Sequence, residues 1–169
     1  MKSKLPPGLI VKVGKFTWTS MWHLMMSRLA PRSESGEYVR PSSQFRNIIS
    51  TEAGNPYQPA AQRYHLYVGL SCPWAHRTLV VRSLKGLENT ISISIASPSS
   101  DNGIWIFDQE EEGCHTLPQL YQKAQPGYNG RATVPVLWDK QTKTIVNNES
   151  AEIIGPKIRA AAEPDDLYR

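Results

Sequence analysis

The feature that most constrains the fold is a strand-like stretch followed at once by a helical pattern that opens near a cysteine. In Tyr64–Leu70, apolar residues alternate with polar or small ones, which is the period-2 pattern of a half-buried strand. After it, apolar residues recur at helical spacing, at Val80, Leu84 and Leu87. Pro73 suits the first turn of a helix, because its missing N–H costs nothing there. Cys72 is therefore expected at the N-terminal end of a helix, at the tip of a strand.

A cysteine in this position has two interpretations. Unpaired backbone N–H groups and the positive end of the helix dipole stabilise a thiolate there, which favours a reactive nucleophile. A free cysteine is also often a small buried hydrophobic side chain that closes a strand. The position at a helix start favours the first interpretation, and we predict that Cys72 is catalytic.

Composition excludes several classes of function. The basic residues that give the net charge of +4 are scattered, and basic runs interleaved with aromatic residues are lacking, so a nucleic-acid partner is not expected. Two cysteines make neither a disulfide framework nor a zinc site, which predicts no metal and a reducing compartment. No apolar run approaches the roughly 20 residues that span a bilayer. We therefore expect a cytoplasmic protein without a membrane partner.

The middle of the chain has the pattern of an α/β domain. Ile91–Ala96 alternates isoleucine with small residues and predicts a strand. Strand, helix and strand in about thirty residues form a βαβ unit, whose two strands should be parallel. Leu117–Ala124 is predicted to be a helix with Thr116 as its N-cap. The run Glu110–Glu112 before it is interpreted as a solvated loop.

Beyond that helix, two short strands are expected, Thr133–Trp138 and Thr144–Val146, which pair as a hairpin. A last helix begins near Asn148-Glu149-Ser150. The order βαβ-αββα predicts a thioredoxin-like α/β fold, with a four-stranded mixed sheet and helices on both faces.

The first sixty residues are interpreted as an extension of this domain. Lys12–Thr19 is either a short strand or irregular, Trp18–Leu29 is a helical candidate, and Pro31–Pro59 has the composition of a loop. The predicted domains are an N-terminal extension at 1–62, a thioredoxin-like domain at 63–154 and a C-terminal tail at 155–169.

Four motifs together carry a resemblance to a known family. They are Ser-Cys-Pro-Trp-Ala-His-Arg (71–77), Leu-Lys-Gly-Leu-Glu (84–88), Gly-Arg-Ala-Thr-Val-Pro-Val-Leu-Trp-Asp (130–139) and Ile-Val-Asn-Asn-Glu-Ser-Ala-Glu-Ile-Ile (145–154). The chain resembles the xi-class glutathione transferases, also called glutathionyl-hydroquinone reductases. Residues 36–47 resemble the extension that precedes the thioredoxin-like domain in that family. The combination is specific, whereas any one motif alone would be weak.

The resemblance implies a reaction and a co-substrate. The Cys72 thiolate would take the glutathionyl group from a glutathionyl conjugate of a quinone, forming a mixed disulfide that a second glutathione resolves. Ala75 stands where a Cys-x-x-Cys dithiol would have its second sulfur, so dithiol exchange is not expected. Cys114 could act as a resolving thiol only if the fold brought it near, and the three glutamates before it should raise its pKa.

The resemblance also implies residues that hold glutathione. Val134 would pair through its backbone with the cysteinyl part of the tripeptide, beside a cis Pro135; the alternative is a trans proline on an edge strand. Ser150 would hold the γ-glutamyl carboxylate and Glu149 its ammonium group; without the resemblance these two are equally well a helix cap.

Two further residues follow from the same resemblance. Trp105 corresponds to a tryptophan that packs on glutathione in the family, and the alternative is an aromatic residue of the core. Arg131 is the cation expected to meet the glycyl carboxylate.

The sequence departs from the family after Ile154. Gly155-Pro156 is a strong helix stop, and the family's C-terminal all-helical domain, which supplies part of the active-site cleft, is expected to be absent. A truncated or alternative product, a cloned fragment and a natural single-domain protein all fit. Two functions therefore stay open, a glutathione-dependent thiol transferase and a glutathione-binding or protein-interaction module with weak turnover. A homodimer also stays open.

Overall fold

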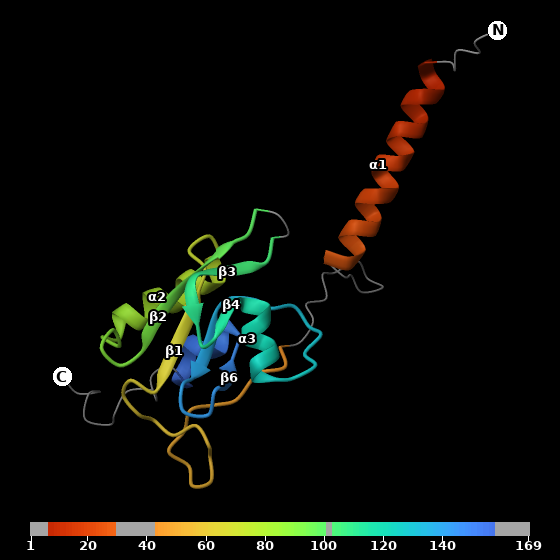
Figure 1. Ribbon diagram of the computed structural model, residues 1–169. Helices are drawn as coiled ribbons and strands as arrows, with labels where there is room; N and C mark the ends of the chain where they lie inside the picture. Colours follow the sequence, from red (N-terminus) through yellow and green to blue (C-terminus); the bar gives the residue numbers. More distant parts are fainter. Residues whose placement is uncertain (1–6, 30–42, 101–102, 158–169) are drawn as a thin grey trace. The chain divides into compact units, whose positions relative to one another are not determined.

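The computed structural model describes residues 7–29, 43–100 and 103–157 of the 169-residue chain (Figure 1). The chain divides into two compact units, Met1–Ser42 and Ser43–Arg169. Residues 31–42 of the predicted loop Pro31–Pro59, and residues 158–169 of the predicted tail, lie outside the described residues. The elements are α1 (Pro7–Leu29), β1 (Tyr64–Val68), α2 (Pro73–Leu84), β2 (Ser92–Pro98), β3 (Trp105–Glu111), β4 (Cys114–Thr116), α3 (Leu117–Ala124), β5 (Val136–Asp139), β6 (Thr144–Asn147), α4 (Ser150–Glu152) and a short π-helical segment at Ile153–Lys157.

The second unit is built on a mixed sheet in the order β4-β3-β2-β1-β5-β6. Strands β1 and β2 are parallel, as the predicted βαβ unit requires, and the other pairs are antiparallel. All five residues of β1 are buried, so the prediction of a half-buried strand was wrong. The reason is topological: β1 lies between β2 and β5 in the interior of the sheet.

The sheet has six strands where four were predicted. The two additional strands, β3 and β4, form an antiparallel hairpin that extends the sheet beyond β2. The predicted solvated loop at Glu110–Glu112 is therefore wrong, since Glu110 and Glu111 belong to β3 and only Glu112 lies in the turn. The carboxylates find partners within the fold: Ser94 Oγ donates to Glu111 (2.5 Å) and Lys143 Nζ lies 2.9 Å from both oxygens of Glu112.

The helices follow local sequence signals. Helix α3 has the predicted bounds, and Thr116 caps it in a capping box with Gln119. Helix α1 is longer than predicted and includes Lys12–Thr19, where a strand or irregular segment was expected. The β-branched residues there imitate a strand pattern, but Thr17 and Thr19 direct their hydroxyls to carbonyl oxygens of their own helix. Within the described residues, no helix combines the length and the apolar character needed to cross a membrane.

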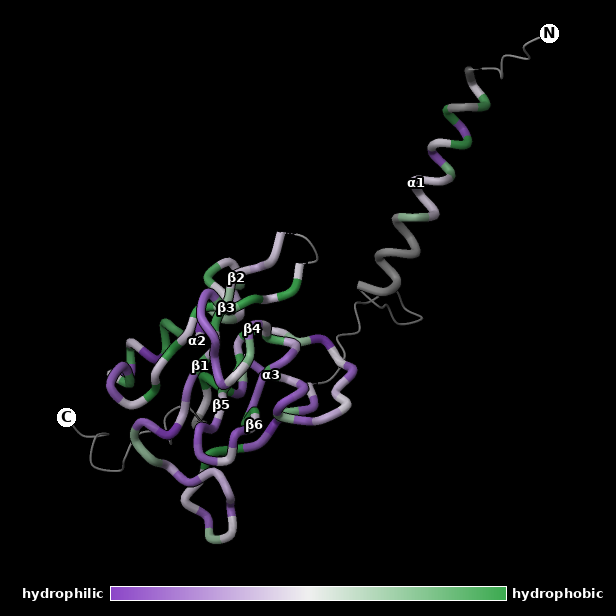
Figure 2. Tube along the Cα trace, in the orientation of Figure 1, coloured by the Kyte–Doolittle hydropathy of each residue, from purple (hydrophilic) through white to green (hydrophobic). Residues whose placement is uncertain are grey.

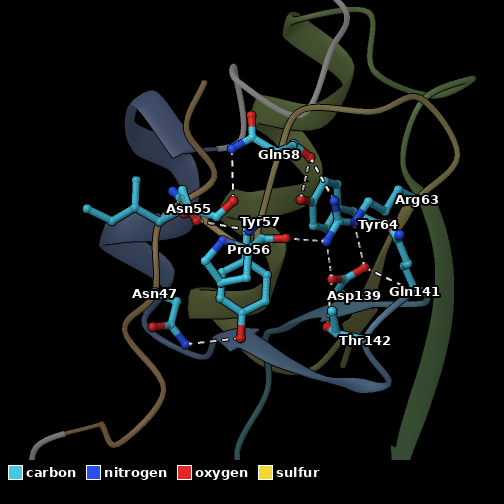
Figure 3. Close-up of polar contacts among 11 residues, drawn as sticks. Asn47, Asn55, Pro56, Tyr57, Gln58, Arg63, Tyr64, Asp139, Gln141 and Thr142 are labelled. Atoms are coloured by element: carbon cyan, nitrogen blue, oxygen red, sulfur yellow. Dashed lines mark hydrogen bonds and ion pairs between the residues drawn. The ribbon is translucent and has the colours of Figure 1, made fainter. Parts of the chain in front are cut away.

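Within the second unit, a buried ion pair joins the segment before β1 to the end of β5 (Figure 3). Arg63 donates to both oxygens of Asp139, at 2.9 and 2.6 Å, and also to the carbonyl oxygen of Pro56 at 2.7 Å. The Asp139 side chain is fully buried, and Thr142 and the Gln141 N–H donate to it as well. Burial raises the pKa of Asp139, but these hydrogen bonds, that of Arg63 first, outweigh it and hold the pKa below its usual range.

The same segment also runs beside β6. Phe45 and Ile49 are buried in the core, and backbone hydrogen bonds join Asn47 N–H to the Val146 oxygen (2.9 Å) and Asn148 N–H to the Phe45 oxygen (3.1 Å). Residues 43–62 therefore pack as part of the compact second unit rather than as a detached arm.

Candidate functional site

Cys72 occupies the predicted position at the start of a helix. It is the N-cap residue of α2, in extended conformation, and its carbonyl accepts the His76 N–H at 2.9 Å. Pro73 stands in the first turn, as expected. The Cys72 side chain is half-buried and makes no capping hydrogen bond of its own. Cys72 thus lies at the N-terminal end of α2, where a helix leaves backbone N–H groups unpaired.

The backbone of Val134 lies beside this sulfur. The distance from Cys72 Sγ to the Val134 carbonyl oxygen is 3.7 Å. The Val134–Pro135 peptide bond is cis, as predicted from the motif, and both residues are buried. Two segments separated by 62 positions in sequence therefore meet at the cysteine.

Ser150 is connected to the cysteine's helix through an arginine. It begins α4, is almost fully buried (1% exposed), and its Oγ accepts from Nε and Nη2 of Arg77 at 3.1 and 2.5 Å. Arg77 belongs to α2, and its guanidinium also stacks over the Trp74 ring, 4.9 Å from the centroid. The sequence analysis assigned no role to Arg77. The observation that could have pointed to it is that Arg77 belongs to the motif Ser71–Arg77, which also contains Cys72.

Glu149 precedes Ser150 as the N-cap residue of α4. Ser43 Oγ lies 3.5 Å from Glu149 Oε2, so the segment before β1 contacts the start of α4. The Glu149 N–H is held by Asn147 Oδ1 at 2.7 Å. The predicted pair Glu149 and Ser150 therefore lies in an ordered turn, with the hydroxyl facing Arg77.

Trp105 lies against the loop that leads to the cysteine. It is partly buried at the start of β3, and its ring covers the backbone of Gly69 so closely that a Cβ there would lie 2.5 Å from Cη2. The ring packs on the core cluster as well. The ring therefore packs between the core cluster and Gly69, which stands three positions before Cys72 in the chain. Packing of Trp105 on glutathione stays a prediction. Gly69 was missed by sequence reasoning, since a glycine requirement of this kind depends on a tertiary neighbour.

The two remaining sequence candidates differ in accessibility. Arg131 is exposed in the loop before Val134, and its carbonyl accepts the Tyr128 hydroxyl at 3.1 Å. Cys114 is only 5% exposed and lies in β4 rather than in a loop. Its pKa is raised, as predicted, but burial is the first cause and the glutamates a lesser one. A buried thiol with a raised pKa is a poor attacking group.

The half-buried sulfur of Cys72 thus lies beside a backbone carbonyl, and the hydrogen-bonded pair Arg77 and Ser150 joins α2 to α4. Such an arrangement suits a one-cysteine thiol exchange with a peptide-like ligand that pairs with an extended backbone. Ala75, where a second sulfur would stand in a dithiol motif, is fully buried. A dithiol mechanism at this motif is therefore excluded by the residues themselves.

Comparison with known proteins finds a matching family model and several similar proteins. The family model described as the glutathione S-transferase N-terminal domain matches residues 71–155. A protein named glutathione S-transferase omega-like 2, from Schizosaccharomyces pombe, is 50% identical over 129 residues, covering 72% of this chain and 41% of that protein. The glutathionyl-hydroquinone reductase YqjG of Escherichia coli K12 is 44% identical over 151 residues, covering 81% of this chain and 44% of its own length.

Solved structures share the fold of the second unit. The xi glutathione S-transferase of Phanerochaete chrysosporium superposes with a TM-score of 0.69 at 39% identity, covering 82% of this chain and 48% of that one. YqjG, solved with glutathione bound, superposes with a TM-score of 0.60 at 46% identity, covering 71% of this chain and 44% of that one. The chain spans less than half the length of each of these proteins.

Proposed function

Because the chain belongs to the glutathione S-transferase family, whose N-terminal domain it contains, we propose that it is a glutathione-dependent thiol transferase with Cys72 as nucleophile. Its substrates are glutathionyl conjugates of quinones, the class that the name of its relative YqjG indicates. We place the reaction in the cytoplasm, where a reducing environment suits two free cysteines.

The observation that carries the proposal is the position of the Cys72 sulfur. It lies at the N-cap of α2 and 3.7 Å from the Val134 carbonyl oxygen, half-buried and so reachable. Thiol exchange requires an accessible sulfur with thiolate character. The relative YqjG binds glutathione in its solved structure, which supports a glutathione site in this chain.

The proposed reaction has two steps. In the first, the Cys72 thiolate attacks the sulfur of the glutathionyl thioether, the S–S bond forms, and the carbon–sulfur bond breaks. The electron pair of that bond stays with the ring carbon, which takes a proton and leaves as the hydroquinone. In the second step a glutathione thiolate attacks the mixed disulfide, releasing oxidised glutathione and the Cys72 thiolate. One glutathionyl conjugate and one glutathione are consumed in each cycle.

The residues around the sulfur are assigned to the parts of glutathione. Val134 pairs through its backbone with the cysteinyl part, and Pro135 shapes that backbone. Ser150 and Glu149 hold the γ-glutamyl end, and the contact from Arg77 to Ser150 brings a positive charge toward the carboxylate. Trp105 forms an apolar wall and Arg131 meets the glycyl carboxylate.

The test is to replace the sulfur and follow both turnover and the intermediate. We expect Cys72→Ser to lower the reduction of glutathionyl-menadiol by about a thousandfold or more, the scale seen when a nucleophile is removed. Mass spectrometry of the unmodified chain mixed with substrate should show one glutathione attached at Cys72. Cys114→Ser is the matched control and should leave both results unchanged, because that sulfur is buried.

The alternative function, a glutathione-binding module, gives a different result in the same experiment. It predicts glutathione binding by the unmodified chain with turnover no higher than that of Cys72→Ser. Equal rates for the two proteins, together with no glutathione adduct at Cys72, would overturn the enzymatic proposal.

A further inference from the structure

Helix α2 carries two arginines whose side chains bind different parts of the fold. In Figure 2 its tube alternates hydrophilic purple and hydrophobic green, because Arg77 and Arg82 stand on either side of three consecutive apolar residues. Arg82 donates from Nε to the Ile91 carbonyl oxygen at 2.7 Å and so joins the helix to the segment that precedes β2. Arg77 donates to Ser150 in α4 instead. It therefore connects the helix of Cys72 to another segment of the proposed glutathione site.

The guanidinium of Arg77 is held by two different contacts. Its Cζ lies 4.9 Å from the centroid of the Trp74 ring, three positions earlier in the same helix. Its Nε and Nη2 both reach the Oγ of Ser150, at 3.1 and 2.5 Å. A planar guanidinium that stacks on an indole and also donates twice to one oxygen is fixed in both position and orientation.

These two hydrogen bonds decide what Ser150 can offer to a ligand. A hydroxyl oxygen has two lone pairs and one proton. The two N–H groups of Arg77 occupy the lone pairs, so the hydroxyl retains its proton as the group that can bind a further partner. Ser150 can therefore donate to a carboxylate oxygen, and it has no lone pair left to accept from an ammonium group.

Arg77 also supplies the charge that a carboxylate needs at this position. Helix α4 comprises only Ser150–Glu152, and the chain after it is kinked at Gly155. A helix dipole grows with the number of aligned peptide units, so the dipole of α4 is small. Glu149 stands directly before Ser150, and its carboxylate would repel a second carboxylate. The guanidinium on Ser150 Oγ offsets this repulsion and makes the hydroxyl a stronger donor.

We propose that Trp74 and Arg77 are positioning residues that fix the Ser150 hydroxyl as the donor to the γ-glutamyl carboxylate of glutathione. Trp74 holds the guanidinium, the guanidinium holds Ser150, and Ser150 is the member of the three that contacts the carboxylate. The inference rests on the function proposed above and adds a source of selectivity to it. The chain selects thiol peptides that carry a carboxylate at this end.

The test is calorimetric binding of reduced thiol peptides to the full chain. The probes are glutathione, 4-aminobutyryl-cysteinylglycine, which lacks the γ-glutamyl carboxylate, and glutaryl-cysteinylglycine, which keeps that carboxylate and lacks the ammonium group. We expect the unmodified chain to bind glutathione about 10- to 100-fold more tightly than the 4-aminobutyryl peptide, the range for a hydrogen bond to a charged group. Arg77→Gln should reduce this ratio to within about threefold. Trp74→Leu should reduce it about two- to fivefold, the scale of a cation–π contact.

The controls separate positioning from a general loosening of the fold. Arg82→Gln removes the same charge from the same helix and should leave the ratio within about twofold of that of the unmodified chain. The ratio of glutathione to the glutaryl peptide, which reports the ammonium group, should change little in Arg77→Gln, whereas a loosened site would lower both ratios. In a chain that already carries Ser150→Ala, adding Arg77→Gln should change the carboxylate ratio little, because Arg77 acts through Ser150.

Four results would count against the proposal. A carboxylate ratio that Arg77→Gln leaves unchanged would overturn it, and so would an equal loss from Arg82→Gln, since net charge would then be responsible. A full effect of Arg77→Gln in the Ser150→Ala chain would show that the arginine contacts the carboxylate itself. Failure of the unmodified chain to bind glutathione would overturn the proposed function and this inference together. An unchanged ratio with a glutathione adduct at Cys72 would overturn the inference alone.

Discussion

At the scale of single residues, the site depends on positions of two kinds. The place of Cys72 could be predicted from the local strand-to-helix transition, and the cis Pro135 from the resemblance to the family. Gly69 and Arg77 could not, because their importance comes from Trp105 and Ser150, which lie more than thirty positions away in the chain. Local spacing carries no information about such partners.

The contact between Gly69 and Trp105 leads to a prediction. A Cβ at position 69 would overlap the Trp105 ring, lying 2.5 Å from Cη2 and 3.2 Å from Cε3. We expect Gly69→Ala to cost about 1–3 kcal/mol of unfolding free energy, the usual range for overpacking, and to move Trp105 away from the loop that carries Cys72. Urea unfolding and turnover measure the two effects. Gly86→Ala is the comparison variant. A Cβ there meets nothing within 4 Å, but φ is +64°, so its loss of stability measures backbone strain without any overlap of atoms.

The double variant Gly69→Ala with Trp105→Leu decides between explanations. If overlap with the ring is the cause, the smaller leucine should recover part of the stability lost by Gly69→Ala. A simple sum of the two single losses would show that Gly69 matters for another reason.

At the scale of elements, local signals predicted well where they were strong. Thr116 as N-cap marked the start of the α3 prediction, and the alternating isoleucines located β2. The hairpin of β3 and β4 was missed because Glu110 and Glu111 suggest solvent, whereas in the fold Ser94 supplies a hydrogen bond to Glu111. These glutamates do not lie in the edge strand, because β4 pairs with β3 on that side of the sheet.

The segment before β1 depends on the pair Arg63 and Asp139 rather than on a regular element. We expect Arg63→Gln to destabilise the second unit by about 3–5 kcal/mol, because it leaves the fully buried Asp139 carboxylate without its cation. The carbonyl oxygen of Pro56 loses its donor in the same variant, so proteolysis should begin in residues 50–62. Urea unfolding and limited proteolysis are the measurements.

Two further variants test whether burial of the ion pair is the cause. Adding Asp139→Asn to Arg63→Gln removes the unpaired charge and should recover part of the loss. Arg46→Gln breaks an ion pair with Glu152 at the surface, where Arg46 is 57% exposed, and should change stability little. A loss from Arg46→Gln as large as that from Arg63→Gln would contradict the role of burial.

At the scale of the whole molecule, the sheet buries an ionisable group, His65, that has no part in the proposed reaction. His65 lies in β1 and is 9% exposed; its Nδ1 is 2.8 Å from Ser92 Oγ, and its Nε2 has no partner among the described residues. Burial is the first cause that lowers the pKa of His65 to about 4, and the positive charges of Lys140 and Arg82 add to it. Between about pH 4 and 6.5, the imidazole of His65 is therefore neutral in the folded chain and protonated in the unfolded chain.

This difference predicts how stability depends on pH. The unfolded chain binds a proton at position 65 below its ordinary pKa of about 6.5, whereas the folded chain does so only near 4. Between these values unfolding takes up a proton, so stability is complete above about pH 6.5 and is lost as the pH falls toward 4, by roughly 3 kcal/mol. Below that, the Asp139 carboxylate, whose pKa is held below its usual range, adds a further loss as it protonates.

Urea unfolding across this pH range separates the two groups. His65→Gln should flatten the stability profile between about pH 6.5 and 4, because glutamine does not titrate, while the steeper loss at lower pH should persist because it belongs to Asp139. Asp139→Asn should show the reverse, a preserved slope above pH 4 and a reduced one below it. A profile for His65→Gln parallel to that of the unmodified chain would mean that the imidazole is not kept neutral by the core. The acid sensitivity of the fold would then have to arise from the carboxylates alone.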